Sequence, residues 1–340
     1  MMTSTIEFYL PSKLNASYPP EKRGIRRDQV RMMVLNRETG ERKHDHFLQL
    51  TSYLQPGDMI ILNNSRTIPA SLQARWESGS YEQDEKVEVR LARRLNHDSW
   101  EALILANSVK ADDKLIFSSD LFASVTKANE DSPVSTIQFS KKGADLLNII
   151  YSIGEPIRYE YINHPWSLNY YQTVFASHPG SVEMPSAGRA FSWELLLNLR
   201  QKGIQIEFLQ LHTGLSYFEE RHNSPTDNFE EYFISEETME RIIRTKNSGK
   251  RIVACGTTVV RAIESAARSG SLSGWTNLYI HPNSSLKLVD GIITGFHEPQ
   301  ASHLDMLTAF VSENYLYEAY QEAIQYSYLW HEFGDMNLIL

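Results

Sequence analysis

Residues 68–155 are the part of this sequence that most restricts its fold. Short β-like segments follow one another there at close spacing, separated by charged or small-residue turns. In one of them Val87, Val89 and Leu91 alternate with charged residues, which indicates a strand with one buried face. Further segments of this kind lie at 100–105, 114–117, 122–126 and 134–139. Closely spaced strands with little helical pattern predict a small barrel or sandwich, and we expect an inserted β-barrel domain over residues 68–155.

The sequence on either side of this interval has the pattern of an α/β protein. Residues 31–47 indicate strand, turn and strand, and Met59–Leu62 indicates a buried strand. Farther along, strand-like and helix-like segments alternate, with Ser192 and Ser235 as helix N-caps. We therefore predict a layered α/β main domain built from residues 1–67 and 156–340. Near its end we expect a strand at 277–282, a hairpin around 288–293, and helices over 304–311 and 316–328.

The composition is that of a soluble globular protein. Of the 340 residues, 41% are hydrophobic and 22% are charged, and the apolar runs are too short to cross a bilayer. The single cysteine, Cys255, excludes an intramolecular disulfide and a zinc site made of cysteines. The N-terminus lacks the basic start and apolar stretch of a secretory signal. We therefore expect a cytoplasmic protein.

The charge is unevenly distributed along the chain. The net charge of −9 argues against a general nucleic-acid coat protein. Residues 22–43 nevertheless hold eight lysines and arginines against three acidic residues. Such an excess suits contact with phosphates, and a solvated loop explains it equally well.

One strand-to-helix junction is informative about ligands. The short apolar run Ile252–Cys255 reads as a buried strand, and Gly256–Thr258 turns it into a helix on which Arg261 and Glu264 are expected to face outward. Backbone N–H groups and two hydroxyls then point out of the turn, an arrangement that suits a carboxylate, a phosphate or a ribose. An ordinary capped junction that binds nothing is the alternative.

Polar residues also follow other predicted strands, at Asn63–Arg66, His212–Gly214 and Gly295–His297. The ends of buried strands are where α/β proteins place ligands. The sequence contains no P-loop, zinc-protease or nucleophile-elbow motif, and no glycine-rich dinucleotide fingerprint. These residues indicate an α/β enzyme-like protein without defining its substrate.

Several longer segments, in a fixed order along nearly the whole chain, match one protein family. They include FYLPSKLNASYPPEKR at 8–23, YLQPGDMIILNNSRTIPASL at 53–72, YYQTVFASHPGSVEMPSAG at 170–188, IEFLQLHTGL at 206–215, RIVACGTTVVRAIESAA at 251–267 and LVDGIITGFHEP at 288–299. Each segment alone is weakly specific. Together they resemble the S-adenosylmethionine:tRNA ribosyltransferase-isomerase family of queuosine biosynthesis.

The resemblance implies a fold and a reaction. The family has an α/β domain made from both ends of the chain and a β-barrel inserted near the first third. Its members move the ribosyl moiety of S-adenosylmethionine onto 7-aminomethyl-7-deazaguanine in the tRNA anticodon. The sugar isomerises to give epoxyqueuosine, while adenine and methionine leave. The resemblance thus implies tRNA and S-adenosylmethionine as partners, with S-adenosylmethionine as the ribosyl donor. It implies no cofactor, no metal and no membrane, and we expect a monomer or a weak dimer.

Site residues follow from the resemblance combined with the polar strand ends. The reaction needs a base beside the sulfonium and groups that accept charge at the departing adenine. The expected catalytic residues are His212, His297 and Arg66. The expected substrate-binding residues are Asn63, Gly188, Gly256, Thr257, Thr258 and Arg261. The expected tRNA-binding residues are Lys22, Arg23, Arg26 and Arg27. A structural role is the alternative for each histidine.

Some polar positions depart from the family pattern. Ala190 and Asn228 stand where the pattern has histidines, and Asn64 stands where it has an aspartate. Asn337 stands where a small apolar residue is common. These changes leave two alternatives open: a diverged paralogue acting on another nucleoside, or a non-catalytic protein that binds S-adenosylmethionine or a nucleoside.

Overall fold

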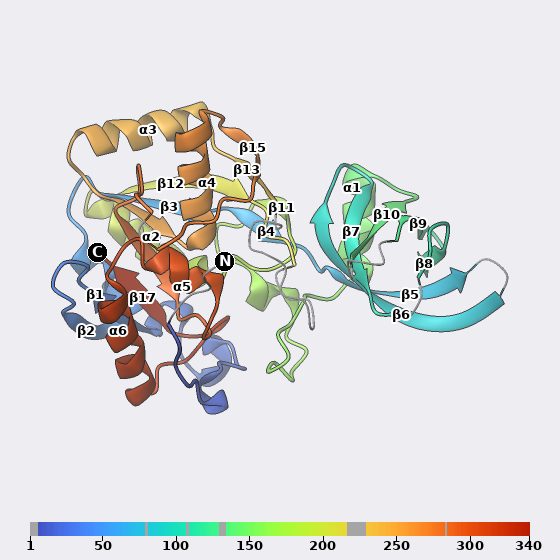
Figure 1. The fold of residues 1–340 in the computed structure, drawn as a ribbon, viewed down its shortest axis with the longest axis horizontal. Helices are drawn as coiled ribbons and strands as arrows, with labels where there is room; N and C mark the ends of the chain where they lie inside the picture. The colour runs from blue at the N-terminus through green and yellow to red at the C-terminus, as the bar shows by residue number, and fades with distance from the viewer. Residues whose placement is uncertain (1–5, 79–80, 107–108, 129–133, 216–228, 283) are drawn as a thin grey trace.

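The computed structural model describes residues 6–78, 81–106, 109–128, 134–215, 229–282 and 284–340. A nine-stranded mixed sheet covered by helices forms one part of the molecule, and a closed six-stranded barrel stands to one side of it (Figure 1). This arrangement confirms the predicted α/β domain with an inserted β-barrel. Within the described ranges, no helix has the length and apolar character needed to cross a membrane.

The large sheet has the strand order β15-β13-β12-β3-β14-β16-β17-β1-β2. Its strands are β1 (Arg31–Leu35), β2 (Arg42–His46), β3 (Met59–Asn63), β12 (Gln205–Leu211), β13 (Glu230–Phe233), β14 (Ile252–Cys255), β15 (Ser273–Thr276), β16 (Gly291–Gly295) and β17 (Met336–Ile339). β12, β3, β14 and β16 are parallel neighbours in the centre, and antiparallel pairs flank them. The carboxyl ends of these four strands therefore meet at one edge of the sheet.

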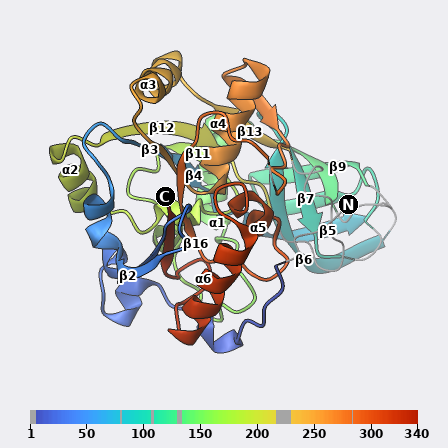
Figure 2. The same cartoon turned by 60° about the vertical axis from the view of Figure 1, so that its left-hand side comes forward.

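Helices cover both faces of this sheet. They are α2 (Trp193–Gln201), α3 (Glu236–Asn247), α4 (Thr257–Ser269), α5 (Ser302–Leu307) and α6 (Glu313–Gln325). Met59 and Ile61 of β3 share a core with α3 to α6, whereas Ile60 and Leu62 share one with α2. Because successive side chains of a strand point to opposite faces, this apolar run contributes to both cores. Figure 2 shows α5 and α6 next to each other.

The helix caps predicted from the sequence are confirmed. The Ser192 hydroxyl accepts the N–H of Leu195 at 3.1 Å at the start of α2, and the Ser235 hydroxyl accepts the N–H of Thr238 at 3.1 Å at the start of α3. These bonds satisfy N–H groups that the first turn of a helix leaves unpaired.

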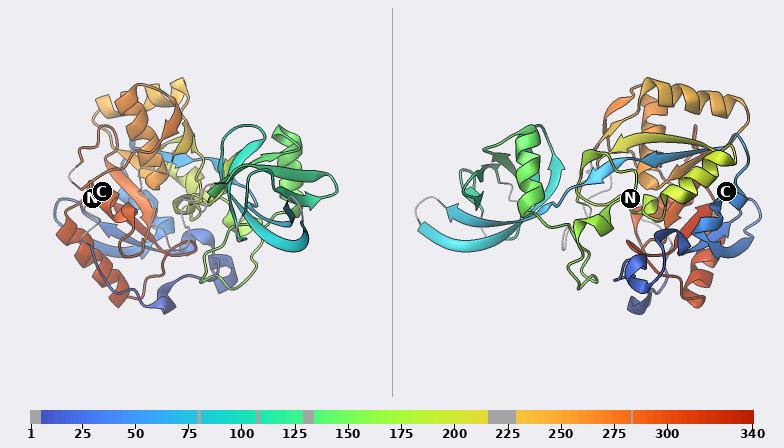
Figure 3. Two further views of the ribbon diagram at one scale, coloured as in Figure 1. Left: turned by 45° about the vertical axis from the view of Figure 1, so that its right-hand side comes forward. Right: turned by 180° about the vertical axis from the view of Figure 1, so that it is seen from behind.

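The barrel has the strand order β10-β7-β6-β5-β8-β9. Its strands are β5 (Ser71–Ser78), β6 (Tyr81–Arg94), β7 (Ser99–Ile104), β8 (Lys114–Ser118), β9 (Leu121–Lys127) and β10 (Val134–Phe139). Helix α1 (Gly143–Ile153), which the strand-only interpretation missed, packs Leu146 and Ile150 into the barrel core. Ser71 and Glu155 exchange backbone hydrogen bonds where the chain enters and leaves this region. Both views in Figure 3 show the barrel standing apart from the sheet.

The C-terminal part differs from the sequence prediction. The prediction of a hairpin around 288–293 is wrong, because β16 pairs with β14 and β17 instead. Asp-Gly at 290–291 is a common hairpin signal. Here the Asp290 carboxylate accepts the N–H of Ile252 at 2.9 Å and binds Lys246 at 2.5 Å, so it ties the start of β16 to its neighbours. The strand expected at 277–282 lies earlier, as β15, and the helix expected over 304–311 ends at Leu307.

Candidate active site

Asn63, at the end of β3, ties two strand ends together. Its amide nitrogen donates to the carbonyl of Leu211 at 2.8 Å, and its amide oxygen accepts the N–H groups of Leu211 at 3.1 Å and Ser65 at 3.0 Å. The amide nitrogen also lies 3.5 Å from the hydroxyl of Thr258. Asn63 is 3% exposed, so this residue, expected to bind substrate, also holds the edge of the sheet in shape.

The Gly256–Thr258 turn lies at the same edge, between β14 and α4. Gly256 has a φ of 90°, which favours glycine, and a Cβ there would lie 3.3 Å from the Cβ of Ala187. Thr257 and Thr258 are buried at the N-terminus of α4. Gly188, one residue beyond Ala187, packs against Thr173 and Phe175. The structure therefore brings the expected residues Gly256, Thr257, Thr258 and Gly188 into one region.

Two residues of α4 face differently from the sequence prediction. Arg261 forms an ion pair with the buried Glu230 of β13 rather than facing outward. Burial raises the pKa of Glu230, and the charge of Arg261 opposes that rise. Glu264 is fully buried and accepts the N–H groups of residues 287–289, so its expected surface position is wrong. Hydrophobic spacing alone could not reveal that the backbone of residues 287–289 supplies partners for this carboxylate.

His212 follows β12 and faces the junction with the barrel. Its Nδ1 lies 2.7 Å from the Ser65 hydroxyl, which in turn lies 2.6 Å from that of Ser181. Burial lowers the pKa of His212 to about 4, and the charge of Arg94 adds to this effect. The ring lies so close to Gly180 that a Cβ there would come within 2.5 Å of it. His212 is thus a neutral imidazole held in a tight position at neutral pH.

His297 follows β16 and belongs to a group of three histidines. Its ring stacks on that of His303, with centroids 4.6 Å apart, and lies 6.4 Å from that of His331. Nε2 lies 2.8 Å from the Thr294 hydroxyl, whereas the buried Nδ1 has no partner among the described residues. Burial lowers the pKa of His297, helped by His303 and His331, and lowers that of His303 to about 3. The three imidazoles are therefore uncharged at neutral pH.

The sequence interpretation assigned no role in the site to His303, His331 or Glu332. His331 and Glu332 line a small hollow, open to solvent, together with Gly295 and Ala190. Ala190, one of the departures from the family pattern, therefore faces the same space as His331. No sequence spacing marks His303 and His331 as neighbours of His297. His303 lies on α5 and His331 in the segment before β17, and only the fold brings these two segments together. Another departure, Asn337, is buried with both of its amide atoms unpaired, and Asn228 lies outside the described residues.

Arg66 lies on β4 (Ser65–Thr67), which pairs with β11 (His178–Ser181). Its guanidinium is exposed and lies over the ring of Tyr151, 5.4 Å from the centroid. Asn63, three residues earlier, is instead buried and donates to the carbonyl of Leu211. The structure does not bring these two side chains together.

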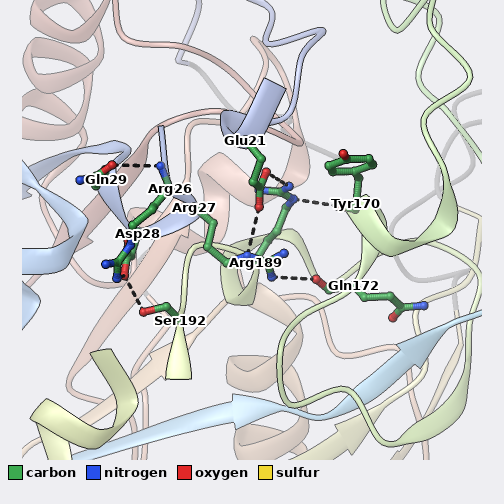
Figure 4. Close-up of polar contacts among 9 residues, drawn as sticks. All are labelled: Glu21, Arg26, Arg27, Asp28, Gln29, Tyr170, Gln172, Arg189 and Ser192. Atoms are coloured by element: carbon green, nitrogen blue, oxygen red, sulfur yellow. Dashed lines mark hydrogen bonds and ion pairs between the residues drawn. The ribbon is translucent and has the colours of Figure 1, made fainter. Parts of the chain in front are cut away.

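The basic residues expected to contact tRNA have partners within the chain (Figure 4). Arg26 pairs with Asp28 at 2.7 Å, and Arg27 pairs with Glu21 at 3.2 Å. Arg26 also pairs with Glu194 at 2.7 Å. Glu21 also binds the buried Arg189 at 2.7 Å, which explains why Arg27 and Arg189 lie so close together. Part of the local positive charge is therefore neutralised, by the nearby acids Glu21 and Asp28 and by Glu194, which is distant in sequence.

The other two basic residues are placed differently. Arg23 donates from Nη2 to the carbonyl of Phe333 at 2.8 Å. The Lys22 ammonium lies over the rings of Trp166 and Tyr170, 5.9 and 5.6 Å from their centroids. A lysine among aromatic rings suits phosphate and base contacts, so Lys22 is the best placed of the four for nucleic acid.

No group of three or more histidine, cysteine, aspartate or glutamate side chains suited to a metal ion occurs in the part of the chain that the structure describes. The site combines the neutral histidines His212 and His297 with the N-terminus of α4, all at the ends of parallel strands. The buried carboxylate of Glu230 comes from the adjoining strand β13. With the inserted barrel, these features define an α/β protein of the enzyme class. A sequence model of the family described as Queuosine biosynthesis protein matches residues 3–339, and the chain belongs to this family.

Similar proteins cover the whole chain. S-adenosylmethionine:tRNA ribosyltransferase-isomerases from Sulfurihydrogenibium sp. (strain YO3AOP1) and Aquifex aeolicus (strain VF5) are 35% and 36% identical to it, over 100% of both chains in each comparison. The crystal structure of S-adenosylmethionine tRNA ribosyltransferase from Thermotoga maritima is similar with a TM-score of 0.58 and 31% identity. It covers 99% of this chain and 100% of that one.

Proposed function

We propose that this chain is an S-adenosylmethionine:tRNA ribosyltransferase-isomerase of queuosine biosynthesis. Its substrates are S-adenosylmethionine and tRNA that carries 7-aminomethyl-7-deazaguanine in the anticodon, and its product is epoxyqueuosine in that tRNA. The observation that carries the proposal is full-length similarity, at 35% and 36% identity, to enzymes with this name. The comparisons give no support to a paralogue with another substrate or to a non-catalytic binding protein. The reaction belongs in the cytoplasm, where tRNA is found.

His297 is the best candidate for the base that removes a proton next to the sulfonium. When its Nε2–H donates to the Thr294 hydroxyl, the lone pair of Nδ1 is free, and Nδ1 has no partner among the described residues. Burial lowers the pKa of His297, so the imidazole is unprotonated at neutral pH and its lone pair is available, while the same shift makes it a weaker base than a free imidazole. His303, stacked on the same ring, holds the plane of His297.

The Gly256–Thr258 turn supplies groups that can bind the donor. The first N–H groups of α4 have no intrahelical acceptors, and the helix dipole favours a carboxylate or polarised oxygen beside them. The hydroxyls of Thr257 and Thr258 suit the ribose. Three further residues stay candidates. His212 is a second neutral hydrogen-bond acceptor, and Arg66 is an exposed cation that can meet negative charge on tRNA. Arg261 stays a candidate for substrate binding together with its ion-pair partner Glu230.

The direct test measures chemistry. Purified protein is incubated with S-adenosylmethionine and tRNA bearing the deazaguanine precursor, and free adenine and the modified nucleoside are measured by mass spectrometry. We expect both products, and none with tRNA that carries guanine at that position. His297→Gln should lower the rate by roughly 10² to 10⁴ fold, the usual contribution of a general base. Donor binding without any adenine release would reject the enzyme assignment, and adenine release without tRNA would indicate another acceptor.

A further inference from the structure

Glu332 is a buried carboxylate at the wall of the hollow described above. It is 6% exposed, and its Oε2 has no hydrogen-bond partner among the described residues. The hollow is also lined by Ser186, Gly295 and His331. Burying a carboxylate oxygen without a hydrogen-bond partner costs free energy, so such an atom in a native protein calls for a partner from outside the chain, such as a ligand, an ion or a water molecule. Its position beside a hollow indicates that a ligand supplies that partner.

The charges around Glu332 do not supply a counter-ion. Glu183 adds negative charge to its surroundings, and Arg189 is the cation that acts on it. Arg189 and Arg27 both line the hollow, but each already binds Glu21, at 2.7 Å and 3.2 Å respectively. Burial, together with Glu183, holds the pKa of Glu332 well above its usual range, against the opposing effect of Arg189. The empty site therefore favours the protonated acid.

Aromatic rings adjoin this carboxylate. The Tyr161 hydroxyl lies 3.4 Å from the backbone nitrogen of Glu332. The ring of Tyr159 stacks on that of Tyr161 at 5.7 Å and meets that of His331 edge-on at 4.6 Å. His331 in turn lies 4.0 Å from Glu298, and burial lowers its pKa, so it adds no positive charge at neutral pH.

Building on the proposed function, we propose that Glu332 binds a positively charged group of the substrate. Three groups in this reaction have that chemistry: the sulfonium and the ammonium of S-adenosylmethionine, and the aminomethyl group of the deazaguanine. A bound cation compensates the carboxylate, which ionises and releases its proton to solvent. Binding therefore tightens as the pH rises, because less of the free protein has to lose that proton.

Isothermal titration calorimetry with three probes identifies the group. The probes are S-adenosylmethionine, S-adenosylhomocysteine, which lacks the sulfonium charge, and free 7-aminomethyl-7-deazaguanine. We compare the wild type with Glu332→Gln, and with Glu318→Gln as a control for an exposed carboxylate that pairs with Arg42. Loss of a charge-assisted contact should weaken the affected probe by about tenfold to a hundredfold in Glu332→Gln. It should change less than about twofold in Glu318→Gln.

The pattern of losses names the source. A loss for S-adenosylmethionine alone assigns the sulfonium, equal losses for both adenosyl probes assign the ammonium, and a loss for the free base alone assigns the aminomethyl group. Equal affinities of wild type and Glu332→Gln for all three probes would overturn the inference, as would failure of the wild type to bind any of them.

A second measurement needs no variant. The affinity of the wild type for the probe that binds is measured from pH 6 to 8 in buffers of different ionisation enthalpy. We expect tighter binding at higher pH and net proton release; a flat profile without proton release would overturn the inference. Adenine release separates the two proposals. Binding that depends on Glu332 without adenine release rejects only the enzyme assignment, and adenine release with unchanged binding by Glu332→Gln rejects only the role of Glu332.

Discussion

Glu264 provides the sharpest test of how the candidate site is supported. This carboxylate on α4 is fully buried and accepts the backbone N–H groups of Lys287 at 2.9 Å, Leu288 at 2.9 Å and Val289 at 3.3 Å. Residues 287–289 lead into β16, which ends just before His297. Glu264 therefore anchors the segment that positions the proposed base.

Glu264→Gln keeps the shape of the side chain and removes its charge. Oε1 accepts the N–H groups of Lys287, Leu288 and Val289, whereas Oε2 accepts only that of Lys287. With the glutamine oxygen at the Oε1 position, all three N–H groups keep an acceptor, and the NH₂ group faces the N–H of the exposed Lys287. The loss is therefore the replacement of charge-assisted hydrogen bonds, worth about 1.5–3 kcal/mol each, by neutral ones worth about 0.5–1.5 kcal/mol. Counted at Leu288 and Val289, this should lower the free energy of unfolding by about 1–3 kcal/mol.

The assay is urea denaturation followed by tryptophan fluorescence, with amide hydrogen exchange at Leu288 and Val289. The control is Glu240→Gln, an exposed glutamate on α3, which should change stability by less than about 0.5 kcal/mol. We expect faster exchange at both amides in Glu264→Gln. If Glu264→Gln is as stable as the control and its exchange is unchanged, the carboxylate does not anchor this segment.

Three further predictions concern other charged groups. Arg261→Ala leaves the buried Glu230 without a counter-charge and should lower the free energy of unfolding by about 3–5 kcal/mol. Adding Glu230→Gln should recover much of that loss, and equal free energies of unfolding for the single and double variants in urea would contradict this. The pKa of His212 is about 4, below the ordinary value of about 6.5, so the unfolded chain binds the proton first as the pH falls. Its contribution to stability is complete above about pH 6.5 and should fall by about 1.4 kcal/mol per pH unit between pH 6.5 and 4; an unchanged slope in His212→Gln would exclude it as the source. Lys22→Ala should weaken tRNA binding and reduce the slope of log affinity against log salt by about one, measured by filter binding at several salt concentrations; an unaltered slope would mean that Lys22 touches no phosphate.

The sequence located the candidate site better than it described the contacts within it. The ends of β3, β14 and β16 could be predicted because a short apolar run followed by glycine or polar residues is a local pattern. Asn63 and Gly256 were therefore found at the right edge. His303 and Glu332 were missed, because nothing near them in the sequence marks them as neighbours of His297 or of a hollow.

Charge was the least predictable property. The run of basic residues from Lys22 to Arg27 suggested an open phosphate-binding surface. In the fold, Glu21 binds Arg27 and the buried Arg189, and Glu194 reaches Arg26 from α2. The pairs Glu21–Arg189 and Glu194–Arg26 join residues that are far apart in sequence, so a count of charges along the chain cannot detect them.

The sequence by itself determined the types of most elements, the inserted barrel and the glycine turn that opens α4, but not helix α1 or the strand pairing around 288–293. Periodicity, helix caps and turn residues act over a few neighbouring positions, and these local preferences are written directly in the chain. Only the tertiary structure decided that Glu264 is buried, that Arg261 neutralises Glu230, and that three histidines and Glu332 gather near one hollow. Those outcomes depend on strand order and on burial, because the cost of burying a charge is set by partners that only the folded chain brings close.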